Sequence, residues 1–163
     1  MHGCISVHAI DACSACNGTY NSVRNLVLEN PFYALPPGFF NVIRVAGGNT
    51  FIYADDDALF TGTFDGTGYD VFTLEIHPKG FATGRGRTLF TGEVDGKSGT
   101  LVIQWVGNTK NDLGWWWFKW VILSGTGDLA NLRGQGTSWG PGPAGPGVWG
   151  GVDYSGKIHF KPD

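Results

Sequence analysis

Residues 115–123 (WWWFKWVIL) constrain the fold of this chain more than any other stretch. Successive side chains of a β-strand point to opposite faces, and both faces of this segment are strongly apolar. The two faces carry Trp115, Trp117, Lys119 and Val121 on one side and Trp116, Phe118, Trp120 and Ile122 on the other. One face must fill a core, and an apolar surface as large as the other usually marks an interface. The segment is therefore a core strand, not half of a solvated hairpin.

The composition favours one all-β domain. The chain has 163 residues, enough to bury a core, and its 27 glycines and low charged fraction of 15% are typical of many strands joined by tight turns. The net charge of −3 gives no basic field for a phosphate backbone, so no nucleic-acid partner is expected. No apolar run is long enough for a membrane span, and the N-terminus lacks the pattern of a secretory signal. We expect a cytoplasmic protein.

Two related segments predict β-hairpins. LFTGTFDG (59–66) is echoed by LFTGEVDG (89–96), and each runs into an Asp-Gly pair that suits a tight turn. The predicted hairpins pair residues 59–64 with 69–77 and residues 87–94 with 100–106. Further strands are predicted at 22–29, 39–46, 115–123, 133–139 and 148–160. The acidic run 55–57 is interpreted as a solvated loop, because it lacks the spacing of a calcium-binding loop.

These strands predict a closed barrel. About eight strands follow one another through short turns, and no convincing amphipathic helix interrupts them. Closing an antiparallel sheet removes its exposed edges, which are otherwise an aggregation hazard. We therefore predict an eight-stranded antiparallel closed barrel over residues 21–163. Residues 1–20 are predicted to form an N-terminal extension.

Two motifs resemble a known group of proteins. GRTLFTGEVDGKSGTLVIQWVG (86–107) and SGTGDLANLRGQG (124–136) resemble a little-characterised bacterial family of the allene-oxide-cyclase-like barrel group. The second motif is also similar to the Gly-Thr-Gly turn of plant dirigent proteins. The resemblance implies an antiparallel barrel, often oligomeric, with an apolar lumen. It transfers no catalytic residue, because the shared motifs are turns and packing positions.

Polar residues inside apolar strands are the candidate catalytic groups. Glu75, Glu93 and Gln104 each alternate with apolar or small residues, and Lys119 interrupts the tryptophan-rich strand. A carboxylate that faces a lumen is desolvated and can act as a general acid or base. The alternative is that these side chains point to water on the outer face.

Aromatic residues and their neighbours are the candidate ligand-binding groups. The tryptophans would floor a lumen for a flat hydrophobic ligand, with a polar side chain as its handle. The candidates are Tyr69, Trp105, Trp115, Trp117 and Arg133. The alternative is that the aromatic side chains serve only core and subunit packing.

The N-terminal residues Cys4, His8, Cys13 and Cys16 leave three interpretations open. Their spacing is tolerable for a zinc site, but the two-pair spacing of a zinc ribbon is missing. The alternatives are a Cys13–Cys16 disulfide or free thiols in a tail. We assign no metal and no cofactor, because no phosphate-binding loop, dinucleotide fingerprint or Ser-His-Asp elbow appears in the sequence.

Three functions follow from these features. The first is a cyclase or isomerase that folds a hydrophobic small molecule in the lumen, by shaping it and supplying one or two polar groups. The second is a non-catalytic barrel that binds such a molecule. The third is a structural oligomer. In each case the spare apolar face of residues 115–123 predicts a homodimer or homotrimer.

Overall fold

The all-β prediction is confirmed. The computed structural model describes residues 14–22, 27–29, 32–34, 40–109, 114–141, 143–145, 148–149 and 151–162. Its strands are β1 (Ser14–Ser22), β2 (Val27–Glu29), β3 (Phe32–Ala34), β4 (Phe40–Ala46), β5 (Asn49–Gly62), β6 (Phe64–Ile76), β7 (Ala82–Val94), β8 (Lys97–Thr109), β9 (Trp115–Gly125), β10 (Leu132–Pro141), β11 (Pro143–Gly145), β12 (Val148–Trp149) and β13 (Val152–Phe160). The helical element in these ranges is the 3-10 turn η1 (Gly127–Leu129). No helix in the described ranges is long and apolar enough to cross a membrane.

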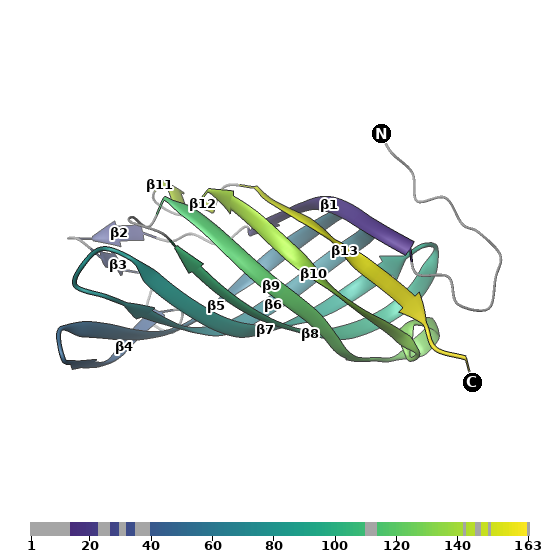
Figure 1. The fold of residues 1–163 in the computed structure, drawn as a ribbon, viewed down its shortest axis with the longest axis horizontal. Helices are drawn as coiled ribbons and strands as arrows, with labels where there is room; N and C mark the ends of the chain where they lie inside the picture. The colour runs from purple at the N-terminus through teal and green to yellow at the C-terminus, as the bar shows by residue number, and fades with distance from the viewer. Residues whose placement is uncertain are drawn as a thin grey trace.

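One large antiparallel sheet forms the body of the protein. Its nine strands run in the order β1-β13-β10-β9-β8-β7-β6-β5-β4, while β2 pairs with β3 and β11 with β12 in two small sheets. Most neighbours in the large sheet are consecutive in sequence, so the strands from β4 to β10 form a meander. In the view of Figure 1, the sheet curls so that β9, β10 and β13 lie in front of β5 and β6.

The prediction of an eight-stranded closed barrel is wrong. The sheet has nine strands with β1 and β4 at its ends, and both end strands share one edge of β5. β1 pairs with the second half of β5, from Ala58 to Gly62, whereas β4 pairs with the first half, from Asn49 to Ala54. The curled sheet is thus bridged over part of its length and is not closed into a barrel.

The strand β1 lies partly within the predicted N-terminal extension. It pairs with β13 through residues 14–20 and with β5 through residues 18–22. The boundary at residue 20 therefore falls inside a strand of the sheet. Cys4, His8 and Cys13 lie outside the described residues, so the zinc, disulfide and free-thiol interpretations stay predictions.

The core follows the two-residue period of the strands. In β6 and β7, buried and more exposed positions alternate over most of each strand. The inward side chains form two clusters, one around Phe64, Phe90 and Trp120 and the other around Ile52, Leu74 and Trp116. Trp105 packs against both clusters and joins them.

The two Asp-Gly pairs have different structures. Asp95 and Gly96 form the predicted turn between β7 and β8, with φ angles of 52° and 74°. The prediction of a second turn at Asp65 and Gly66 is wrong, because both residues lie inside β6. Gly66 pairs with Gly92 of β7, and a Cβ on Gly66 would lie 2.3 Å from the Thr91 carbonyl oxygen. Glycine is needed there for close packing of the strands.

The acidic run 55–57 is not a loop. It lies in the middle of β5, with Asp56 on the inward face and Asp57 exposed on the outer face. The interpretation as a solvated loop is wrong. Buried and exposed positions alternate along β5, but three identical acidic residues give no sign of this alternation in the sequence.

Candidate functional site

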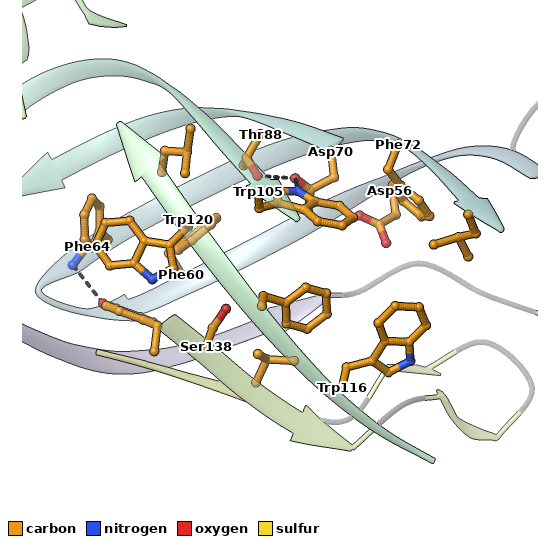
Figure 2. Close-up of a pocket in the computed structure, with 15 residues that line it drawn as sticks. Asp56, Phe60, Phe64, Asp70, Phe72, Thr88, Trp105, Trp116, Trp120 and Ser138 are labelled. Carbon is orange, nitrogen blue, oxygen red and sulfur yellow. Dashed lines mark hydrogen bonds between the residues drawn. The ribbon is translucent and has the colours of Figure 1, made fainter. Parts of the chain in front are cut away.

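A cavity lies between the two core clusters, on the inner side of the curled sheet. Its volume is about 90 Å³. Figure 2 shows its lining side chains, which come from strands on opposite sides of the cavity. They are Asp56, Phe60, Phe64, Asp70, Phe72, Leu74, Thr88, Ile103, Trp105, Trp116, Phe118, Trp120, Ser138, Val152 and Tyr154. Eight of these 15 residues are aromatic, so the walls are mainly rings.

Three polar residues stand side by side across neighbouring strands. Asp56 of β5 is the register partner of Asp70 of β6, and Asp70 is the register partner of Thr88 of β7. All three are buried, and the two aspartates are only 4% and 3% exposed. Directly opposed residues of antiparallel strands have Cβ atoms about 4.5–5.5 Å apart. Two carboxyl groups are therefore held close together in an apolar environment.

The Asp70 carboxyl group has two hydrogen-bond donors. The Thr88 hydroxyl donates to Asp70 Oδ1, and the Trp105 indole Nε1 donates to the same oxygen at 3.4 Å (Figure 2). Donors directed at a carboxylate favour its ionised form. Asp70 is thus positioned as the charged member of the pair.

Glycines make room for the aromatic walls. A Cβ on Gly86 would lie 2.6 Å from the Trp105 ring. Gly136 and Gly156 are register partners on β10 and β13, and a Cβ on either would lie within 2.5 Å of the Trp120 ring. Large inward rings and small inward neighbours together shape the cavity.

Other polar groups near the cavity are engaged in structural hydrogen bonds. The Tyr154 hydroxyl donates to the Thr61 carbonyl at 2.9 Å and accepts from the Phe64 amide at 3.0 Å. The Trp120 Nε1 donates to the Thr137 carbonyl at 3.2 Å. These bonds connect β5, β6, β9, β10 and β13, so the two residues stabilise the curled sheet.

Among the predicted ligand-binding residues, Trp105 lines the cavity. Trp115 and Trp117 point to the outer face of β9 and are 41% and 42% exposed. The prediction that Trp115 and Trp117 line a lumen is wrong, because the opposite face of β9, with Trp116 and Trp120, packs inward. Tyr69 is also on an outer face, where its hydroxyl donates to Asp55.

Arg133 has a local structural role. Its guanidinium Nη1 donates to the carbonyls of Ala130 and Leu132, at 3.0 and 2.6 Å. These contacts stabilise the turn between η1 and β10. Arg133 does not line the cavity.

The four predicted catalytic residues lie outside the cavity. Glu75 is half-buried and accepts a hydrogen bond from the Asn49 side chain at 2.6 Å. Glu93 is exposed and accepts from Ser98 at 3.2 Å. Gln104 and Lys119 lie on the outer faces of β8 and β9. Of the two orientations that the sequence left open for these side chains, the structure shows the outer one, because in each strand the neighbouring positions turn inward. Their catalytic role stays a prediction.

The structure nevertheless brings three predicted residues to one outer surface. Glu75, Trp117 and Lys119 line a wide open groove of about 1430 Å³. Arg44 and Arg85 line the same groove. Leu74, Phe118 and Ser138 line both this groove and the cavity, whereas Asp56, Asp70 and Thr88 line the cavity and not the groove.

The sequence reasoning missed Asp56, Asp70 and Thr88. Asp70 alternates with Phe72, Leu74 and Ile76, which are the most apolar positions of β6. That alternation was a usable signal for a buried carboxyl group. For Asp56 the uniform acidic run hid the inward position.

The described residues contain no group of His, Cys, Asp or Glu side chains that could hold a metal ion. The two cavity aspartates form a carboxyl pair across neighbouring strands. Their neighbours supply hydrogen-bond donors and aromatic surface.

Comparison with known proteins supports the fold and leaves the activity open. No curated protein matches the chain. The fold is similar to that of a crystal structure of a protein of unknown function from the DUF3224 family of Shewanella oneidensis MR-1, with a TM-score of 0.65 and 18% sequence identity. The match covers 93% of this chain and 100% of that one. It supports an all-β fold and gives no support for an allene-oxide-cyclase-like assignment.

Residues 44–139, more than half of the chain, match the family described as "Protein of unknown function (DUF3224)", and the chain therefore belongs to this family.

Proposed function

We propose that the protein binds a small, mostly apolar molecule in the aromatic cavity. The cavity volume of about 90 Å³ sets the size of this molecule. Since a cavity of about 150 Å³ accepts benzene, a ligand of about four or five heavy atoms is the appropriate class. The ring-lined walls would supply its apolar contacts.

The observation that carries the proposal is the opposed pair Asp56 and Asp70. Burying carboxyl groups costs folding free energy, and apolar residues at such positions are often at least as stabilising. Opposed like charges on neighbouring strands add to that cost. Departures from local stability rules are expected at functional sites, so the pair supports a binding role for the cavity.

A cyclase or isomerase is the second candidate. It is favoured by the same carboxyl pair, because two neighbouring carboxyl groups can divide the roles of proton donor and proton acceptor. In this candidate, Asp70 would accept a proton from a bound substrate and Asp56 would return one. The motif resemblance to the allene-oxide-cyclase-like group motivates this candidate.

Assembly and location belong to the proposal as well. The exposed Trp115 and Trp117 support a homodimer or homotrimer, because a cluster of exposed indoles is typical of a contact surface. A structural oligomer without a ligand is the alternative. Cytoplasmic residence remains a prediction from the sequence.

Tryptophan fluorescence tests the binding proposal. Trp105, Trp116 and Trp120 line the cavity, so a bound molecule should change their emission. The titration would use small alkyl alcohols, alkylamines and aliphatic ketones, with the melting temperature as a second measurement, because a ligand of the native state stabilises it. A Trp115→Phe, Trp117→Phe background removes the signal of the two exposed indoles of β9. If no probe changes either the emission or the melting temperature, the proposal fails.

A further inference from the structure

We propose that the cavity selects a small organic ammonium cation, with its charged group at Asp56 and Asp70 and its alkyl part among the aromatic rings. This inference rests on the proposed binding function and names the chemical class of the ligand. It follows from four features of the cavity: a stabilised carboxylate, a second carboxyl group opposite it, aromatic walls, and the charges of the lining residues.

The first feature is the Asp70 carboxyl group. Its Oδ1 accepts from both the Thr88 hydroxyl and the Trp105 indole. Hydrogen bonds to an ionised acceptor are stronger than bonds to a neutral one, so this arrangement stabilises a negative charge in the cavity wall. A buried negative charge in turn favours a positively charged partner.

The second feature is the position of Asp56 directly opposite Asp70. Two carboxyl groups so close together do not both ionise readily, because their charges repel and little water reaches them. Without a cation, the pair is expected to retain a proton and to titrate as a unit. An ammonium group provides a positive charge and several N–H donors. Both carboxyl groups can accept hydrogen bonds from these donors.

The third feature is the aromatic wall around the pair. Trp116 and Phe118 are stacked, with ring centroids 5.6 Å apart. Trp105 stands almost perpendicular to Phe118, at an interplanar angle of 88° and a centroid distance of 5.5 Å. Ring faces attract cations through their quadrupole, and tryptophan does so most strongly. The same rings give apolar contact to alkyl groups, so both parts of an alkylammonium ion are matched.

The fourth feature is the charge of the lining. Among the described residues around the cavity, the titratable groups are Asp56, Asp70 and Tyr154, and none is Lys, Arg or His. The Tyr154 hydroxyl is engaged with the β5–β6 backbone. An anionic ligand would be repelled by the pair.

Binding is expected to release a proton. In the free protein the pair retains one proton, and in the complex the ammonium group takes its place while the proton passes to the buffer. The ammonium ion keeps its own protons, because a simple alkylamine has a pKa close to that of lysine, about 10.4. Affinity should therefore increase as the pH rises through the titration of the pair.

Isothermal titration calorimetry with two probes of similar shape tests this inference. Isopropylammonium carries the charge and propan-2-ol lacks it. We expect the ammonium ion to bind at least about tenfold more tightly, which corresponds to about 1.4 kcal/mol. Repeating the titration in two buffers with different protonation enthalpies should reveal proton release for the ammonium ion and none for the alcohol.

The outcomes separate this inference from the function on which it rests. If the alcohol binds as tightly as the ammonium ion, or more tightly, the cation inference is overturned and the binding function stands. If neither these probes nor the wider panel of small molecules binds, both fail. These measurements use the wild-type chain, so they do not depend on the folding of a variant.

Variants then locate the selectivity. Asp56→Asn and Asp70→Asn keep the side-chain shape and remove the charge, so each should reduce the preference for isopropylammonium over propan-2-ol by about tenfold. Asp57→Asn is the matched control, since it removes a carboxylate from an exposed position next to Asp56. An unchanged preference in both cavity variants would overturn the assignment of the cation to this pair.

Discussion

Asp56 and Asp70 face each other across β5 and β6, and both side chains are buried in the cavity wall. A lone buried carboxyl group can be satisfied by donors, as Asp70 is by Thr88 and Trp105. A second carboxyl group opposite it adds repulsion. This relationship links the fold to the proposed function.

Removing the Asp56 charge is expected to stabilise the free protein. Asp56→Asn relieves the opposed pair, and relief of one cross-strand repulsion is on the order of 1 kcal/mol in the free energy of unfolding. The gain should be larger at higher pH, because repulsion in the wild type grows as both groups ionise, and it should vanish in acid. Urea denaturation at several pH values measures this dependence.

Asp57→Asn serves as the control for that series. Its side chain is exposed, so we expect a change within about 0.5 kcal/mol at every pH. A loss of more than about 1 kcal/mol in Asp56→Asn, independent of pH, would show that the Asp56 carboxyl group stabilises the fold and is not under repulsion.

The Thr88 hydroxyl should be coupled to the Asp70 charge. Thr88→Val keeps the shape and removes the donor, so the free energy of unfolding should fall by about 1.5–3 kcal/mol, the range for a hydrogen bond to a charged group. Thr88→Ser keeps the hydroxyl and loses about 0.8 kcal/mol for one buried methyl group.

A double-mutant cycle with Asp70→Asn isolates this contact. If the hydroxyl acts through the Asp70 carboxylate, Thr88→Val should cost clearly less in the Asp70→Asn background. Equal costs in the two backgrounds would mean that the Thr88 hydroxyl does not depend on the charge of Asp70.

The outer tryptophans test the predicted assembly. Trp117 is exposed on β9, beside Trp115 at a ring-centroid distance of 6.2 Å. If this surface joins subunits, the wild type should sediment as a dimer or trimer, and Trp117→Lys should shift it toward the monomer. Leu89→Lys is the control, because Leu89 is an exposed apolar residue on the outer face of β7. A monomeric wild type would refute the predicted assembly.

The sequence was sufficient to predict strands and one turn. The two-residue period identified the strand segments of residues 87–106, and Asp95-Gly96 adopts the positive φ angles that such a pair tolerates. The Asp-Gly pair at residues 65–66 led to a wrong prediction. Asp and Gly can adopt the backbone angles of a tight turn, but they also fit inside a strand. There, close approach between Gly66 and Gly92 fixes the register instead.

The site was harder to predict because the two faces of β9 look alike. Each face carries two tryptophans, so hydrophobicity could not decide which face turns inward. The decision is made by partners far away in sequence. Gly136 and Gly156 leave the space that the Trp120 ring fills, and Gly86 does the same for Trp105. Such complementarity becomes visible once the register of the sheet is known.

The sequence was also insufficient to predict which strands pair at the edges of the sheet. Strand count and edge protection favoured a closed barrel, but β4 and β1 divide one edge of β5 between them. Which strand occupies an edge depends on pairing over long separations in sequence. Local patterns carry little information about that choice.

A variant that fills the cavity tests the central claim most directly. Ile103 lines the cavity and is the register partner of Thr88, so Ile103→Phe would place a ring beside the aspartate pair. Its folding would be checked by melting temperature and near-ultraviolet circular dichroism. The decisive measurement is the calorimetric affinity for isopropylammonium in the wild type and in this variant. We predict measurable binding to the wild type and a loss of at least about tenfold in the folded variant. Equal affinity in the two proteins would contradict a binding site in the cavity.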